Sequence, residues 1–126
     1  MAKKTILIVD DDAFVRMTYK HCFEDAGYTV FLTENGQEAT TFLESQVIDA
    51  MLLDLFMPEK DGIETLLEVK RRFPNVPVIV MSGRAVCGRF DLLGAAVKLG
   101  AHAMVRKPIP PPELMQIIER STSAYH

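Results

Sequence analysis

Five short apolar runs divide the 126-residue chain, and each is followed by a segment with helical periodicity. Three runs are continuous rather than alternating, which is typical of strands buried on both faces of a parallel sheet: Ile6–Val9, Ala50–Leu53 and Val78–Met81. Val30–Leu32 and Ala103–Val105 are shorter, and we expect them to be edge strands. This order of segments limits the chain to an α/β fold more strongly than any single motif does.

Between the runs, apolar residues recur at the spacing of one helix face, which predicts five helices. The last helix begins at the prolines at 110–112, because the first residues of a helix need no N–H donor. The apolar positions are Val15, Tyr19, Cys22 and Ala26 before Gly27; Ala39, Phe42 and Leu43 after Asn35-Gly36; Ile63, Leu66 and Leu67 before Pro74; Leu93, Ala96 and Val97 before Gly100; and Leu114, Ile117 and Ile118. The alternation predicts one domain over residues 1–126, a doubly wound (βα)5 three-layer sandwich around a parallel five-stranded sheet.

Composition and charge argue against two classes of function, nucleic-acid binding and membrane insertion. The chain is 48% hydrophobic and 25% charged, with a net charge of −3 and a pI near 5.6. This mild acidity argues against non-specific nucleic-acid binding, and no apolar stretch approaches the roughly 18 residues of a membrane span. We therefore expect a cytoplasmic protein without a direct nucleic-acid or membrane partner. Cys22 and Cys87 lack metal-ligand spacing, which leaves a disulfide open but favours free thiols.

Polar residues follow four of the apolar runs. Ligands of parallel α/β sheets bind beyond the carboxyl ends of the strands, so these residues are the candidate site. They are Asp10, Asp11 and Asp12 after the first run, Asp54 after the third, Ser82-Gly83 after the fourth, and Arg106-Lys107-Pro108 after the fifth. In the common 2-1-3-4-5 strand order, the first and third strands are neighbours and their acids converge.

Crowded carboxylates repel one another unless a cation neutralises them, and their oxygens suit Mg²⁺. Acids, a hydroxyl and a lysine around such a metal are the functional groups that phosphoryl transfer uses, with one carboxylate as the nucleophile. Each residue alone also has a structural explanation: Asp12 as a helix N-cap, Asp10, Asp11 and Asp54 as turn residues, Ser82 as a strand-end hydroxyl and Lys107 as a surface charge. Their joint placement at several strand ends favours the functional interpretation.

From about Thr5 to Arg120 the sequence resembles the receiver domain of two-component response regulators. The resemblance is carried by Ile6–Asp12, Met51–Pro58 with Asp61-Gly62, Val80–Gly83, Gly100-Ala101 and Lys107-Pro108. It implies a flavodoxin-like fold with strand order 2-1-3-4-5. It also implies a phosphorelay role, in which a sensor histidine kinase or a phosphotransfer protein donates a phosphoryl group.

The resemblance also implies residue roles. Asp54 is the expected phosphoacceptor, and Ser82, Gly83 and Lys107 are expected to bind the phosphoryl group. Mg²⁺, which Mn²⁺ can replace, is expected on Asp11, Asp54 and the Phe56 carbonyl, with Asp10 acting through a metal-bound water. A cis peptide is expected at Lys107-Pro108.

The sequence departs from the family pattern at Met104, Phe56, Arg84 and the segment 84–90. Met104 stands where the family places a switch aromatic; we interpret it as a core residue, which puts an aromatic switch in doubt. Phe56 and Arg84 occupy positions that, in the family it resembles, tune the phosphoryl lifetime. The segment 84–90 is longer than usual, either as a lid or partner loop or as an indifferent insertion.

We expect a stand-alone receiver rather than an enzyme with a separate substrate, because one receiver occupies the whole length and leaves no output domain. Its output would then be phosphorylation-dependent binding of an unidentified protein through the face of the fourth and fifth helices, as a monomer or weak dimer. Three alternatives stay open. An aspartyl phosphatase would need an acid where Phe56 stands, and a nucleotide binder would need Ser, Thr or Gly donors after the first strand. A degenerate receiver would act as a phosphorylation-independent interaction module.

Overall fold

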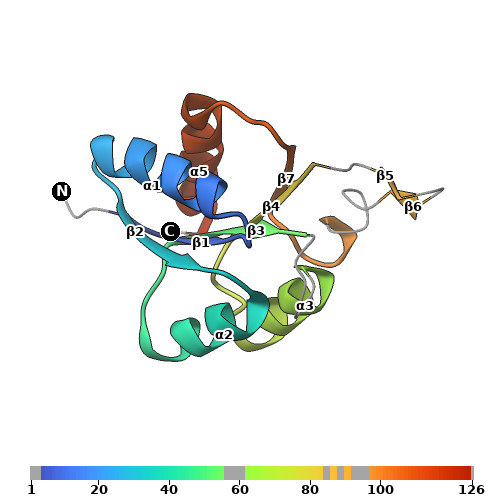
Figure 1. The fold of residues 1–126 in the computed structure, drawn as a ribbon. Coiled ribbons are helices and arrows are strands. Elements are labelled where there is room, and N and C mark those ends of the chain that lie inside the picture. Colours follow the sequence, from blue (N-terminus) through green and yellow to red (C-terminus); the bar gives the residue numbers. More distant parts are fainter. Residues whose placement is uncertain (1–3, 56–61, 84–85, 88–89, 92–96, 126) are drawn as a thin grey trace.

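A parallel five-stranded sheet organises the chain (Figure 1). The computed structural model describes residues 4–55, 62–83, 86–87, 90–91 and 97–125. Its strands are β1 (Thr5–Val9), β2 (Thr29–Thr33), β3 (Ala50–Asp54), β4 (Val78–Ser82) and β7 (Ala103–Arg106). They pair in the order β2-β1-β3-β4-β7, which is the predicted 2-1-3-4-5 order. The flavodoxin-like α/β fold is confirmed.

Burial follows position in the sheet. Every residue of β3 and β4 is buried, as is all of β1 except its first residue, because helices cover both faces of these central strands. The outer strands β2 and β7 have mixed burial patterns, so the prediction that they are edge strands is confirmed. In the register, Val9 of β1 lies opposite Leu53 of β3, and Asp54 lies opposite Met81 of β4. The carboxyl ends of these strands therefore meet.

Four described helices form the outer layers. Helices α1 (Ala13–Asp25) and α5 (Pro111–Tyr125) cover one face of the sheet, and α2 (Gly36–Ser45) and α3 (Gly62–Arg72) cover the other (Figure 1). Two helix starts follow from their sequences. Asp12 caps α1 by accepting the N–H groups of Phe14 and Val15, as predicted, and Asn35 caps α2 by accepting that of Glu38.

Each face of the sheet has its own apolar cluster. One cluster joins the sheet to α2 and α3 through residues such as Leu43 and Leu66, and the other joins it to α1 and α5 through Phe23, Leu114 and Ile118. Three of the apolar positions on the predicted helix faces are exposed: Ala26, Leu67 and Val97. In α1 the fully buried side chain is Phe23, three residues before Ala26.

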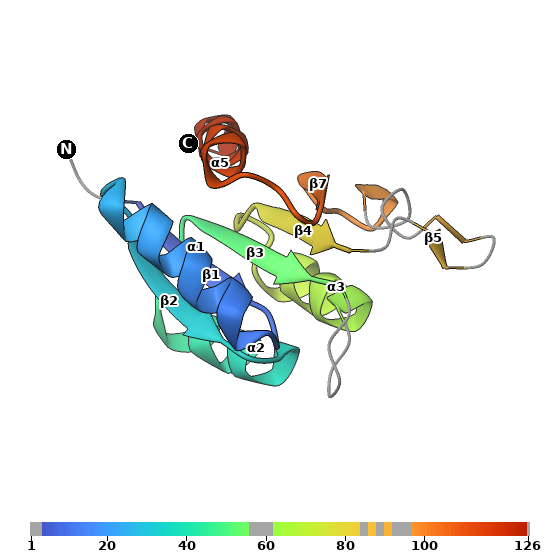
Figure 2. The same cartoon turned by 45° about the horizontal axis from the view of Figure 1, so that its top comes forward.

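The segment after β4 differs most from the sequence prediction. A two-stranded antiparallel hairpin, β5 (Val86–Cys87) and β6 (Phe90–Asp91), stands beyond the carboxyl end of β4, away from the main sheet (Figure 2). The sequence predicted only a loop there. The predicted fourth helix falls largely on 92–96, outside the described residues; of its described residues, Val97 and Lys98 are helical.

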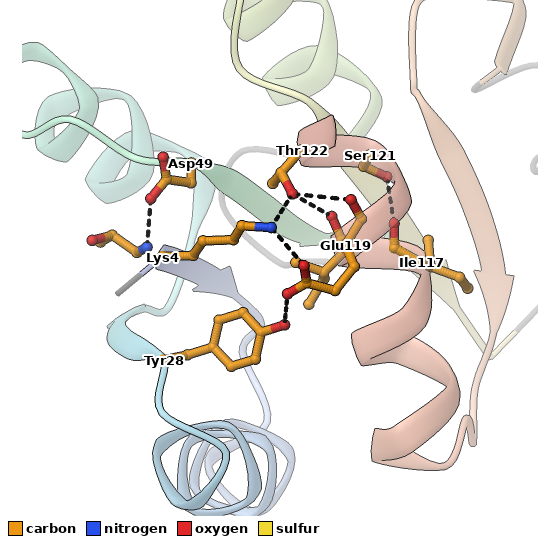
Figure 3. A network of polar contacts seen from close by, with 9 residues as sticks. Lys4, Tyr28, Asp49, Ile117, Glu119, Ser121 and Thr122 are labelled. Carbon is orange, nitrogen blue, oxygen red and sulfur yellow. Dashed lines mark hydrogen bonds and ion pairs between the residues drawn. The ribbon is translucent and has the colours of Figure 1, made fainter. Parts of the chain in front are cut away.

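At the amino end of the sheet, a polar network ties α5 to the first two strands (Figure 3). The Lys4 ammonium donates to Glu119 at 2.6 Å and to the Thr122 hydroxyl at 2.8 Å, and the Tyr28 hydroxyl donates to the other Glu119 oxygen at 2.5 Å. The Lys4 and Tyr28 hydrogen bonds hold the pKa of Glu119 below its usual value. The network anchors the last turns of α5.

The cysteines and the lengths of the helices bear on two expectations from composition. Cys22 is a free thiol, whereas the side chain of Cys87 lies outside the described part of the chain. Within the described helices, none has the length and apolar character needed to cross a bilayer.

Candidate functional site

Three carboxylates converge at the carboxyl end of the sheet. Asp10 and Asp11 directly follow β1, and Asp54 ends the neighbouring strand β3. One oxygen from each lies within 4.8 Å of the others. Asp10 is fully buried and Asp54 is 5% exposed, whereas Asp11 faces solvent. The structure therefore brings together the acids that the sequence placed at two different strand ends.

Asp10 makes four hydrogen bonds, two through its carboxylate and two through its backbone. Its carboxylate accepts the Asp12 N–H at 2.9 Å on Oδ1 and the Lys107 ammonium at 2.5 Å on Oδ2. Its backbone N–H donates to the Thr33 carbonyl at 3.2 Å, and its carbonyl accepts from Arg16 at 2.7 Å. Because both carboxylate oxygens already have donors, Asp10 is fixed in orientation.

Lys107 supplies the positive charge of the site. It directly follows β7, and its ammonium lies 3.5 Å from Asp54 as well as against Asp10. Burial alone would lower the pKa of Lys107, but the hydrogen bond to Asp10 and the charges of Asp54 and Asp10 raise it above the usual lysine value. Lys107 therefore stays cationic. The Lys107–Pro108 peptide is cis, as the resemblance implied.

Ser82 and Gly83 lie beside Asp54 at the end of β4. Asp54 pairs with Met81 in the register, so Ser82 lies one position beyond it. The Ser82 side chain is fully buried, and its carbonyl accepts the Lys107 N–H at 2.8 Å, which joins the ends of β4 and β7. Gly83 is exposed, and a Cβ built on it would meet nothing within 4 Å. Its backbone therefore borders open space.

The carboxylate set fits a magnesium ion. Oxygen ligands at the usual Mg²⁺ distance are separated by about 3 to 4 Å in an octahedron, close to the spread of the three acids. Asp11, which is exposed, is the acid of the β1 end best able to turn an oxygen toward an ion, since both oxygens of Asp10 already have donors. The Phe56 carbonyl and the Arg84 side chain, both named from the sequence, lie outside the described residues.

The interpretation of Met104 as a core residue is wrong. Its side chain is 43% exposed. Side chains alternate along a strand, and Ala103 and Val105 occupy the β7 face that packs with the α5 side of the sheet. Met104 points to the opposite face of an edge strand.

Two residues near the site carry contacts that sequence reasoning did not assign. The Gly62 N–H donates to the Leu55 carbonyl at 3.0 Å, and a Cβ on Gly62 would lie 2.3 Å from Leu55 Cα and 2.6 Å from the Asp54 carbonyl. The start of α3 therefore lies directly against the end of β3, which only glycine permits. Arg16 contacts Asp10; the available signal was a cation one turn into the helix that follows the aspartate run.

A family model described as the response regulator receiver domain matches residues 6–119. The chain belongs to this family. It is 34% identical to the chemotaxis protein CheY of Thermotoga maritima, over 93% of this chain and 96% of CheY. It is 33% identical to the DNA-binding transcriptional regulator NtrC of Salmonella typhimurium over 99% of this chain, which spans only 26% of NtrC.

Solved receiver structures share the fold over nearly the full length. A CheY-like receiver domain protein from Methanospirillum hungatei has a TM-score of 0.89 at 27% identity, with 98% of this chain and 97% of that chain covered. The receiver domain of a sensor histidine kinase from Pseudomonas aeruginosa has a TM-score of 0.86 at 27% identity, with 97% and 99% covered. That structure has a magnesium ion coordinated in its active site cleft. Receiver domains belong to two-component systems, so this chain is a signalling domain.

Proposed function

We propose that Asp54 accepts a phosphoryl group from the phosphohistidine of a sensor kinase or a phosphotransfer protein. The observation that carries the proposal is the convergence of Asp54 with Asp10, Asp11 and the Lys107 ammonium at one end of the sheet. A carboxylate nucleophile, a second acid able to bind a cation and a fixed positive charge are the parts that phosphoryl transfer needs.

The transfer exchanges one bond to phosphorus for another. A carboxylate oxygen of Asp54 attacks the phosphorus, the bond from phosphorus to the imidazole nitrogen breaks, and the histidine leaves with the electron pair of that bond. Lys107 offsets the negative charge on the phosphoryl oxygens from its position beside Asp54, 3.5 Å away. The Ser82 hydroxyl and the Gly83 N–H donate hydrogen bonds to the same oxygens.

Bound Mg²⁺ would neutralise further charge on the phosphoryl group. Asp11 and Asp54 would hold it, with the Phe56 carbonyl as a third ligand and Asp10 contributing through water. Mn²⁺ would substitute, since it accepts the same oxygen ligands. Asp10, with its donors from Asp12 and Lys107, serves chiefly to hold the lysine and the turn in place.

The output is a change in protein–protein affinity upon phosphorylation, with no separate substrate turned over. The face of the fourth and fifth helices is the proposed contact for the downstream protein or a weak dimer, and the edge strand β7 adds Met104 as an exposed apolar side chain. Because the net charge of the chain is −3, we propose that its partners are proteins and that it makes no direct contact with nucleic acid or with a membrane.

Incubation with acetyl phosphate and Mg²⁺ tests the proposal. We expect the intact mass of the protein to increase by one phosphoryl group, and the increase to be absent in Asp54→Asn and after Mg²⁺ is chelated. Asp25→Asn is the matched control, because Asp25 is an exposed acid on α1 and its loss should leave the modification intact. Wild-type protein that stays unmodified under these conditions would instead indicate a phosphorylation-independent interaction module.

A further inference from the structure

Arg16 is a cation held against the acidic end of the sheet. It lies in α1, one turn after the N-cap Asp12, and its side chain is only 13% exposed. One guanidinium nitrogen donates to the Asp10 carbonyl at 2.7 Å, and the other lies 3.4 Å from a carboxylate oxygen of Glu34. Arginine is suited to such two-armed contacts because its donors are fixed in one plane.

The carbonyl that Arg16 binds belongs to the peptide that joins Asp10 to Asp11. A peptide unit is planar, so a carbonyl that is fixed in direction also fixes the N–H on its other side. The Asp10 N–H is fixed separately, by the Thr33 carbonyl at 3.2 Å. Arg16 therefore sets the direction in which the chain leaves Asp10, and with it the position from which the exposed Asp11 side chain starts.

The Glu34 contact orients the guanidinium. Glu34 follows β2, the strand that pairs with β1, and its side chain is 64% exposed. The ion pair is therefore screened by solvent and contributes little to stability by itself. Its geometric effect is to keep one guanidinium nitrogen of Arg16 directed at Glu34, so that the other remains on the Asp10 carbonyl.

We propose that Arg16 is a positioning residue of the metal site: it holds the Asp10–Asp11 peptide so that Asp11 meets a cation in a single geometry. This inference rests on the proposed function. Outer contacts of this kind typically change metal affinity by about 10- to 100-fold when they are removed. A cation near the site also repels Mg²⁺, so loss of the charge alone would tighten binding. The two effects of Arg16 therefore have opposite signs, and a measurement can separate them.

The test measures Mg²⁺ affinity by calorimetry in wild type, Arg16→Met and Arg16→Lys. We expect Arg16→Met to weaken Mg²⁺ binding by about tenfold, because the loss of positioning outweighs the loss of repulsion. Arg16→Lys keeps the charge without the two-armed geometry and should also weaken binding. Lys20→Met is the matched control: Lys20 is another cation of α1 that pairs with Glu24 and does not contact Asp10. It should leave the affinity within about twofold of wild type or slightly tighter.

A second readout needs no metal. The Asp12 N–H donates to Asp10 Oδ1, so loosening of the turn should speed the hydrogen exchange of this amide in metal-free Arg16→Met and Arg16→Lys, but not in Lys20→Met. Unchanged or tighter Mg²⁺ binding in both Arg16 variants would overturn the inference. If Arg16→Met does not fold, Arg16→Lys decides by the same criteria. Wild-type protein that is not phosphorylated would count against the proposed function, whereas phosphorylated wild type with unaffected Arg16 variants would count against Arg16 alone.

Discussion

Replacing Asp54 with asparagine should stabilise the metal-free protein. At an effective dielectric constant of about 20, the Lys107 ammonium 3.5 Å away attracts the Asp54 carboxylate by about 5 kcal/mol. The carboxylates of Asp10 and Asp11, within 4.8 Å, each repel it by about 3 kcal/mol before solvent screens the exposed Asp11. These pair energies nearly cancel. What remains is the cost of burying the charged Asp54 side chain, which as a side chain is only 8% exposed; this cost is several kcal/mol.

Urea unfolding measures this difference. In EDTA we expect the free energy of unfolding of Asp54→Asn to be about 2 kcal/mol higher than that of wild type. At a typical m-value this corresponds to a urea midpoint about 1 M higher. Excess Mg²⁺ should then stabilise wild type by about 2.7 kcal/mol at 100 times its Kd and stabilise the variant less, so that the two midpoints converge or cross.

The control and the refuting result are both specific. Asp25→Asn removes the same charge from an exposed position, with the Asp25 side chain 75% exposed, and should change stability by no more than about 0.5 kcal/mol. If Asp54→Asn were less stable than wild type in EDTA, the attraction of Lys107 would outweigh both the repulsion and the burial cost. The acids would then not be a strained cluster that a cation relieves.

Four further substitutions test contacts that hold the fold, near the site and at the opposite end of the sheet. Gly62→Ala should destabilise by about 3 kcal/mol in thermal unfolding, because its Cβ meets backbone 2.3 Å away; Gly83→Ala, with nothing within 4 Å, should change the melting temperature little. Asp12→Ala should cost about 1 kcal/mol in urea unfolding through loss of the α1 cap. The pKa of Glu119 is lowered in the folded state. The ionised Glu119 carboxylate therefore contributes fully to folding stability above its usual pKa of 4.5, and this contribution is lost as the pH falls through the folded pKa. The stability difference between wild type and Glu119→Gln should therefore shrink below about pH 4.5, and a difference that is constant with pH would contradict the role of Lys4.

The sheet could be predicted from sequence because its signal is local. A strand covered on both faces is apolar at nearly every position, and Ile6–Val9, Ala50–Leu53 and Val78–Met81 each form such a run. Helix faces were predicted less well, because periodicity shows which residues share a face but not where the sheet lies beneath it. Leu67 fits the apolar period of α3 and is 46% exposed, whereas Thr65 is fully buried.

The hairpin β5–β6 shows a second limit of the sequence signal. Each of its strands has only two residues, Val86–Cys87 and Phe90–Asp91, which is too short for any period to be visible. Contacts between distant segments set a third limit. The Lys4–Glu119 ion pair joins residues at opposite ends of the chain, and no local pattern marks it.

The aspartate run shows most directly what residue type alone cannot predict. Asp10, Asp11 and Asp12 are identical in sequence, but the chain passes there from a buried strand to a helix start, and each aspartate lies in a different environment. Asp10 is still inside the sheet, so its charge must be paired, and Lys107 and the Asp12 N–H pair it. Asp12 is already the helix cap. Asp11, between them, is exposed and close to Asp54, and so is the member of the run best placed to exchange solvent for a cation. The position of each residue along this turn, more than its chemistry, determines which aspartate can be a ligand.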